Sequence, residues 1–402
     1  MKKMISRRAF LKAAGVATTA AALTACGGGS SSSTAAGGDA AVITIGVMGP
    51  LTGGAAVYGN AVVNGAMLYI DQVNAAGGIN GKKINAIKMD EKGDATEAVN
   101  VYTKMLDEGI TGLVGDVTTG PTLAVVAESQ EANMPMVTAS ATAEAVTYDA
   151  ETDTVYTNVF RTTFTDPYQG QRMADFAWEV MSKKTAAVLY ASGNDYSEGL
   201  YKNFVAQFTA NGGTVVAEEA YVEGDADFNA QLTNIKGKNP EVVFLPNYYQ
   251  DNGMILGQAR GLGIDVPFIG GDGWDGIVTT SERYAEADEL AGCYFCANYA
   301  PGANTGFEDA YKNAYGEAYP NGFAPLGYDA AVTLLYGIEK AEAAGLEVGT
   351  DAYKQAVIDG IKNGEVKGVT GTFTFDEHNN PVKSIFIQSF DAEGWPVLDR
   401  EF

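Results

Sequence analysis

The sequence has very little histidine, the residue on which many catalytic and metal sites depend. Its one histidine, His378, lies in the turn-like segment Asp376–Asn380, and no G-x-S-x-G elbow occurs in the 402 residues. A Ser-His-Asp hydrolase needs an imidazole beside its nucleophile, and a structural zinc site needs several nitrogen or sulfur ligands. The composition therefore argues against both, and we expect a protein that is not an enzyme and has no cofactor or metal.

Cysteine is also scarce, with three residues in the whole chain. Two of them, Cys293 and Cys296, form a C-x-x-C pair inside an aromatic, strand-like run. A redox C-x-x-C motif normally lies near a βαβ unit, whereas residues three apart in a strand point to opposite faces. We therefore interpret both cysteines as packing residues.

Basic residues are few, and five of the 26 Lys and Arg fall within residues 1–26, which contain no acidic residue. The remainder of the chain has 21 basic and 50 acidic side chains, a formal charge of −29. A surface so acidic repels phosphate backbones, so the charge argues against nucleic-acid binding.

Long apolar runs are absent after the first uncharged stretch, Ala13–Ala25, which follows the basic residues of the N-terminus. This order is typical of a signal peptide, and the run is too short to span a membrane. Ser6–Lys12 resembles a twin-arginine export signal, and Leu23–Cys26 resembles a bacterial lipobox. We predict a signal peptide over 1–25, a lipid anchor on Cys26 with a flexible Gly/Ser tether over 26–40, and an extracytoplasmic protein anchored to the cell membrane.

Strand-like and helix-like segments alternate along the rest of the chain. A first series of strands is predicted near 42–48, 83–89, 112–117 and 134–139, and a second near 185–190, 214–221, 241–245 and 267–270. Final strands are predicted at 371–375 and 384–391. Alternation of this regularity predicts an α/β fold with two Rossmann-like lobes, each built on a parallel sheet.

The turns that follow these strands carry candidate ligand-binding side chains. Thr118–Thr122 and Thr138–Thr142 are rich in hydroxyls, while Asn247–Gln250 and Gly271–Asp275 bring tyrosines and Asp272. Ligands of open α/β sheets bind beyond the carboxyl ends of the strands, near helix N-termini. Hydroxyls and amides opposite a carboxylate suit a zwitterion. The same residues also suit ordinary helix caps and turns, so the pattern leaves both interpretations open.

Two other motifs are incomplete. Gly271–Gly276 fits G-x-G-x-x-G after a strand, but Trp274 and Asp275 would crowd and repel a pyrophosphate. Asp225-x-Asp227-x-Asn229 begins like a calcium loop, but Ala230 and Lys236 stand where glycine and glutamate are needed.

Several segments resemble the leucine/isoleucine/valine-type periplasmic binding proteins, the type I solute-binding fold, over nearly all of the chain after the leader. The segments that carry the resemblance are Gly49–Gly53, Tyr58-Gly59, Asn64–Ala66, Val73–Gly81, Asp195–Gly199, Gln258–Gly263 and Gly327–Ala330. The resemblance implies an amino-acid ligand, held at Tyr58, Thr119, Ser140, Thr142, Tyr196, Tyr248, Asp272, Trp274 and Phe323.

In this resemblance the threonines and serine bind the carboxylate, Asp272 binds the ammonium, and the aromatic residues enclose the side chain. The sequence departs from branched-chain members at Asp272, where they tend to carry glutamate, and at Trp274, which adds bulk. A cysteine pair that some relatives use as a first-lobe disulfide is missing. Amino-acid binding is thus expected, with the leucine-type specificity open.

The resemblance also implies an arrangement of domains and a mode of action. The N-terminal lobe would comprise 41–162 and 299–371, and the C-terminal lobe 163–298 and 372–402, with crossings near 161–163, 294–301 and 369–372. Hinge closure would trap the ligand, and a monomer would deliver it to an ABC permease with separate ATPase subunits. A urea, amide or short-peptide ligand, or a sensory role, fits the same pattern.

Overall fold

The computed structural model describes residues 42–316 and 318–402. The predicted signal peptide, Cys26 and the tether lie outside these residues. None of the helices in the described part of the chain combines the length and apolar character needed to cross a membrane.

Five parallel strands form the first sheet, in the order β2-β1-β3-β4-β7. Their bounds are β1 (Ile43–Gly49), β2 (Ile84–Asp90), β3 (Leu113–Val114), β4 (Met136–Thr138) and β7 (Val159–Arg161). Both faces are covered, which explains why the central strands read as apolar runs without polar alternation.

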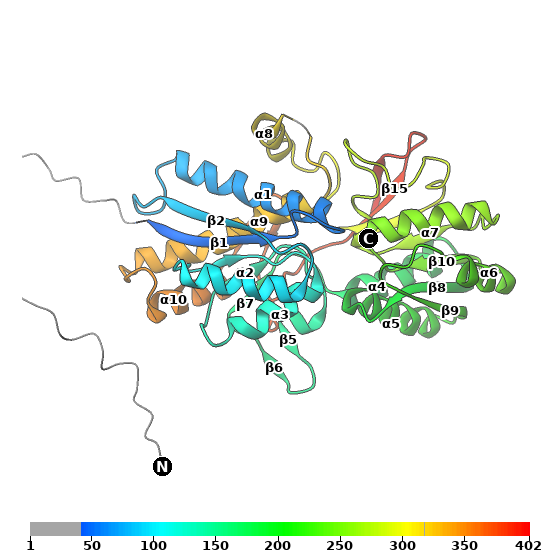
Figure 1. Cartoon of the computed structure of the whole chain (residues 1–402), viewed down its shortest axis with the longest axis horizontal. Coiled ribbons are helices and arrows are strands. Elements are labelled where there is room, and N and C mark those ends of the chain that lie inside the picture. Colours follow the sequence, from blue (N-terminus) through cyan, green and yellow to red (C-terminus); the bar gives the residue numbers. More distant parts are fainter. Residues whose placement is uncertain (1–41, 317) are drawn as a thin grey trace, which may run out of the picture. The chain divides into compact units, whose positions relative to one another are not determined.

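Two groups of helices cover the two faces of this sheet. One face packs against α1 (Ala56–Ala75), α9 (Phe323–Ala343) and α10 (Asp351–Lys362), and the other against α2 (Ala95–Asp107) and α3 (Thr119–Ser129). Figure 1 shows α1 and α9 side by side. The short helix α8 (Thr305–Tyr315) contacts α1.

Gly65 of α1 and Gly327 of α9 explain this close helix pairing. A Cβ on Gly65 would lie 1.9 Å from the Ala324 carbonyl oxygen, and a Cβ on Gly327 would lie 2.1 Å from the Val62 carbonyl oxygen. Only glycine allows the two backbones to approach this closely. The glycine motifs noted in the sequence therefore fix the packing that positions α9.

The second sheet has the order β16-β15-β12-β11-β10-β8-β9. Its parallel strands are β8 (Thr185–Ser192), β9 (Thr214–Val222), β10 (Val242–Leu245), β11 (Phe268–Gly270) and β12 (Tyr294–Ala297). Two antiparallel strands extend one edge, β15 (Phe386–Phe390) and β16 (Pro396–Glu401). Helices α4 (Asp166–Asp175) and α5 (Asp195–Ala210) cover one face, and α6 (Asn229–Lys238) and α7 (Tyr249–Gly261) cover the other. The predicted α/β fold with two parallel-sheet lobes is confirmed.

One predicted strand has a different role. The segment 371–375 was predicted as a strand, and Thr372–Phe373 within it form β14, but this strand joins neither large sheet and pairs with β13 (Val366–Lys367). The preceding residues Val369 and Thr370 donate their backbone N–H groups to the Asp329 side chain, so this stretch is tied to α9. A separate two-stranded hairpin is formed by β5 (Tyr148–Asp149) and β6 (Thr154–Val155).

The two cysteines pack as predicted. Both are buried and free, and they belong to different cores: Cys293 packs with the core that includes α6 and α7, and Cys296 with the core that includes α4 and α5. Burial raises the pKa of Cys293 to about 11, so the thiol stays protonated and unreactive near neutral pH.

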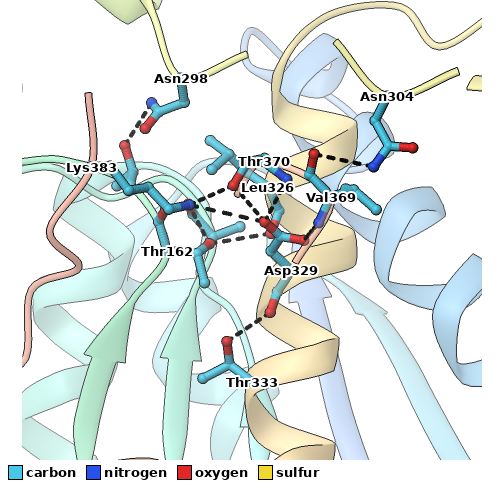
Figure 2. Close-up of polar contacts among 11 residues, drawn as sticks. Thr162, Asn298, Asn304, Leu326, Asp329, Thr333, Val369, Thr370 and Lys383 are labelled. Carbon is cyan, nitrogen blue, oxygen red and sulfur yellow. Dashed lines mark hydrogen bonds and ion pairs between the residues drawn. The ribbon is translucent and has the colours of Figure 1, made fainter. Parts of the chain in front are cut away.

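A buried polar cluster joins α9 to the three segments that run between the sheets (Figure 2). The Asp329 carboxylate accepts hydrogen bonds from the backbone N–H groups of Val369 at 2.6 Å and Thr370 at 3.0 Å. Lys383 Nζ donates to the Thr162 carbonyl oxygen at 2.7 Å and lies 3.9 Å from Asp329. We call these five residues the hinge cluster.

Two further bonds lie beside the hinge cluster, one at Thr163 and one from Thr162 of the cluster itself. Asn298 Nδ2 donates to Thr163 Oγ1 at 2.9 Å, and Thr162 Oγ1 donates to the Leu326 carbonyl oxygen at 3.2 Å. All three predicted crossing segments therefore contact one another or α9 within a few ångströms, as Figure 2 shows.

Candidate ligand-binding site

Two hydroxyl-rich turns lie next to each other at the carboxyl ends of β3 and β4, which are paired neighbours in the first sheet. After β3 the chain enters α3, whose first residue, Thr119, is buried, with Pro121 in the first turn. The first amides of a helix have no partner within that helix, so they favour an anion. After β4, Ser140 and Thr142 line the same cavity as Thr119.

The two hydroxyls of the second turn differ in their bonding. Ser140 Oγ donates to the Val117 carbonyl oxygen at 2.7 Å, so its proton is already used. Thr142 Oγ1 is buried and makes no hydrogen bond of regular geometry, but it interacts with the Asp166 carboxyl and lowers the pKa of that group. A buried hydroxyl held this weakly can turn to donate to a ligand carboxylate.

Asp272 lies across the cavity, in the short turn Asp272–Trp274 after β11. Its carboxylate accepts a hydrogen bond from the Tyr196 hydroxyl at 2.9 Å, and the Gly273 N–H donates to the same hydroxyl at 2.8 Å. Asp272 N donates to Gln169 Oε1 at 3.1 Å, which fixes the turn. The acid is therefore held rigidly at the edge of the cavity.

The buried acidic side chains at the Asp272 end of the cavity favour a positively charged ligand group. Asp272 is only 4% exposed, and burial raises its pKa to about 6. Burial also raises the pKa of Asp166, the neighbouring acid, to about 8, although side-chain hydrogen bonds from Thr142 and Gln169 act in the opposite direction. An ammonium group would stabilise the ionised form of such carboxyls.

Aromatic rings from helices that cover the first sheet and from helices that cover the second sheet meet at the centre of the site. Tyr58 of α1 stacks on Phe323 at the start of α9, with ring centroids 4.3 Å apart. Tyr196 of α5 stacks on Tyr248 at 4.9 Å, and Tyr248 meets Tyr58 edge-on at 5.7 Å. The Tyr58 hydroxyl donates to the Gly273 carbonyl oxygen at 2.6 Å, which links α1 to the turn that carries Asp272.

These rings leave little space between them. The enclosed cavity measures about 10 Å³, comparable to the room that one water molecule needs. It shares Thr118 and Tyr248 with a larger cavity of about 360 Å³, whose wall includes Lys92 and Glu223. A ligand of amino-acid size therefore requires the aromatic residues of the two halves to separate before it enters.

Eight of the nine residues predicted to bind ligand line the enclosed cavity: Tyr58, Thr119, Ser140, Thr142, Tyr196, Tyr248, Asp272 and Phe323. The ninth, Trp274, does not line it. Its indole is fully buried, and Nε1 donates to the Leu245 carbonyl oxygen at 2.8 Å, so the ring belongs to the core beneath the turn.

Three lining residues were not singled out as ligand contacts: Val117, Thr118 and Gly273. Thr118 and Gly273 do lie within the predicted ligand-binding turns, because the ends of parallel strands meet at one edge of the sheet. Val117 and Gly273 carry no polar side chain, so nothing in their chemistry distinguishes them. The predicted lipidation site, Cys26, lies outside the described residues.

Comparison with known proteins agrees with this geometry. The profile of a family described as periplasmic binding protein matches residues 42–394. A Leu/Ile/Val-binding protein of Rhizobium johnstonii is 32% identical over 362 residues, covering 88% of this chain and 92% of the relative. A leucine-, isoleucine-, valine-, threonine- and alanine-binding protein of Pseudomonas aeruginosa is 29% identical, covering 84% and 87%.

Solved structures of binding proteins also match this chain. The branched-chain amino acid transporter substrate-binding protein LivJ of Streptococcus pneumoniae, in complex with isoleucine, matches with a TM-score of 0.78 and 31% identity, covering 90% of this chain and 100% of that one. The leucine-binding protein LivK of Thermotoga maritima matches with a TM-score of 0.78 and 28% identity, covering 90% and 99%. The chain belongs to the periplasmic binding protein family, whose members bind solutes for transporters and are not enzymes.

Proposed function

We propose that this protein is the extracytoplasmic solute-binding component of an ABC importer and that it captures an amino acid between its two lobes. The observation that carries the proposal is the opposition, across one cavity, of a carboxylate cradle at Thr119 and Thr142 and the buried acid Asp272. Donors for a carboxylate on one side of a cavity and an acid for an ammonium on the other are the groups that an α-amino acid requires. Relatives whose names include leucine, isoleucine and valine support the ligand class.

Each part of the ligand has a complementary partner in this proposal. The ligand carboxylate takes the N-terminal amide of α3 and the Thr142 hydroxyl, and Ser140 supports the turn beside it. The ammonium binds Asp272. The side chain packs against the four rings of Tyr58, Tyr196, Tyr248 and Phe323 once the lobes have opened and closed again.

The cellular setting follows from the same proposal. The lobes would comprise 41–162 with 299–371 and 163–298 with 372–402, closing about the hinge cluster. A monomer anchored to the membrane by a lipid on Cys26 would deliver its ligand to a permease powered by separate ATPase subunits. No nucleotide-binding loop was found in the sequence, which supports an ATPase on another chain.

A longer polar ligand, such as a short peptide or an amide, is the second candidate. The cavity of about 360 Å³ beside Tyr248 has charged and amide side chains on its wall, among them Lys92, Asp195, Gln250 and Asp251. A ligand that extended past Tyr248 would meet these groups.

A thermal-shift screen of the purified protein separates the two candidates. A ligand that binds only the folded state raises the melting temperature. The proposal predicts a rise with one or more free amino acids. A response confined to peptides or amides favours the second candidate, and no response to any of these compounds contradicts both.

Thr142→Val should weaken amino-acid binding by roughly 10- to 100-fold, because a hydrogen bond to a charged group is worth about 1.5–3 kcal/mol. The free energy of unfolding should fall only slightly, since the Thr142 hydroxyl makes no hydrogen bond of regular geometry and loses only its interaction with Asp166. Isothermal titration calorimetry and chemical denaturation measure the two effects. Ser140→Ala is the matched control: it removes the bond to Val117 and should lower the stability.

Amino-acid affinity should rise as the pH increases from 5 to 7. The ligand ammonium needs the ionised Asp272, whose pKa is raised to about 6 in the ligand-free protein by burial. Below that pKa the carboxyl must lose its proton on binding, so affinity should be about tenfold lower at pH 5 than at pH 7. Titration calorimetry between pH 5 and pH 7 tests whether the affinity rises with pH, and Asp272→Asn should remove this pH dependence. An affinity that falls with rising pH would contradict the assignment of Asp272.

A further inference from the structure

A second cavity lies beside Asp275, which directly follows the turn that carries Asp272. It measures about 220 Å³ and is more than twentyfold larger than the enclosed cavity of the amino-acid site. Its walls come from four stretches of chain that are far apart in sequence: the segment after β11, the segment after β12, the start of α9, and the β15–β16 hairpin. None of its lining residues lines the amino-acid site.

Asp275 gives this cavity a buried negative charge. The residue is 6% exposed, and its Oδ2 accepts a hydrogen bond from the Gly322 N–H at 2.8 Å. No lysine or arginine forms an ion pair with it within residues 42–316 and 318–402. Burial raises its pKa to about 7, and the nearby charge of Asp272 adds to the rise. A buried carboxylate with a single neutral donor is strongly stabilised by a cationic partner.

The remaining walls are mostly aromatic and apolar. Tyr299 is buried and meets Tyr319 edge-on at 5.6 Å, and Trp395 stands at the rim with 37% of its surface exposed. Gln388 donates through Nε2 to the Tyr299 carbonyl oxygen, while its buried Oε1 has no partner among the described residues. Aromatic faces attract cations and flat rings, so these walls complement the acid.

We propose that this cavity is a second binding site, which takes a small aromatic ammonium compound with its amine at Asp275 and its ring against Tyr299, Tyr319 and Trp395. Such a ligand matches the cavity in charge, since no lysine or arginine of the described residues pairs with the acid, and in polarity, since aromatic side chains line the walls. The pairing of a few convergent polar groups with an apolar lining is the usual composition of a small-molecule site.

The position of the site couples it to the amino-acid site. Asp275 directly follows the turn whose residues Asp272 and Gly273 line the amino-acid cavity, and Gly322 precedes Phe323, which lines it from α9. The Asp275–Gly322 bond thus joins the second sheet's turn to the first sheet's helix. An occupant that contacts both sides favours the closed arrangement, so each ligand raises the affinity of the other by the same factor.

The test uses phenethylamine and tryptamine as probes, with phenethyl alcohol as the neutral isostere of the first. Titration calorimetry of the native protein should show that phenethylamine binds at least about tenfold more tightly than the alcohol. Asp275→Asn, which keeps an oxygen for the Gly322 N–H, should remove that preference. Asp272→Ala should keep it, because Asp272 belongs to the other site.

Two outcomes overturn the proposal: neither amine binds the native protein, or Asp275→Asn binds them as the native protein does. The second outcome, if it comes with loss of binding in Asp272→Ala, would place the probes in the amino-acid site. Circular dichroism checks that the variants fold. Thr280→Phe fills the exposed side of the cavity without touching Asp275, and it should weaken the amines at least about tenfold. If the second-site proposal fails, the amino-acid proposal still stands, because it does not depend on Asp275.

Discussion

Replacing Asp272 with alanine should weaken amino-acid binding by about two to three orders of magnitude, since removing one partner of a buried charge pair costs about 2–5 kcal/mol. The loss is large because the ligand ammonium would be buried with no carboxylate to replace its water. The Tyr196 hydroxyl, which now donates to Asp272, would also lose its acceptor. Titration calorimetry with the amino acid found in the thermal-shift screen measures the effect directly.

Three controls test whether the loss of affinity is specific to the carboxylate of Asp272. Asp272→Glu restores the acid that branched-chain relatives tend to carry and should keep most of the affinity. Asp288→Ala removes an exposed acid elsewhere and should change nothing. The Asp272→Ala protein should still melt cooperatively. If it binds the amino acid as tightly as the native protein, Asp272 does not hold the ammonium.

Replacing Asp329 with alanine should lower the free energy of unfolding by about 3–5 kcal/mol, the cost of breaking a buried ion pair by removing one partner. Burial lowers the pKa of Lys383 to about 8 and raises that of Asp329, so each group pays a desolvation penalty that its partner offsets. Without Asp329, the N–H groups of Val369 and Thr370 also lose their acceptor. Urea denaturation followed by circular dichroism measures the loss.

The double variant Asp329→Leu with Lys383→Met should recover much of that stability, because it leaves no unpaired charge. Lys202→Ala, which breaks an exposed pair with Glu198, should cost no more than about 1 kcal/mol. Equal effects of Asp329→Ala and Lys202→Ala would show that the hinge cluster does not stabilise the fold.

The fold was largely predictable because local signals and tertiary structure agree. Buried parallel strands are apolar runs such as Ile43–Gly49, and the Gly and Asn residues at positive φ, such as Gly109 and Asn239, mark where helices end. Strand β16 escaped prediction because its residues are almost all exposed, so it carries no apolar pattern. The strand within 371–375 was predicted, but its place outside the two large sheets was not, because its neighbours Val369 and Thr370 bond to Asp329, about 40 residues away in the sequence.

The site was predictable to the extent that its residues follow strands. Thr119, Ser140, Tyr248 and Asp272 were found from their places after β3, β4, β10 and β11. Tyr58 and Phe323 lie near the starts of long helices, and only the family resemblance pointed to them. Trp274 shows the limit of such reasoning, because its neighbours Asp272 and Gly273 face the cavity while its own indole turns into the core.

The central claim is that one amino acid lies between the lobes with its carboxylate at the start of α3 and its ammonium at Asp272. A crystal structure of the protein with the amino acid identified in the screen tests it most directly. The account predicts ligand carboxylate oxygens within hydrogen-bond distance of the Thr119 amide and the Thr142 hydroxyl, and the ligand nitrogen beside the Asp272 carboxylate. A ligand bound in the reverse orientation, or outside the space enclosed by Tyr58, Tyr196, Tyr248 and Phe323, would contradict it.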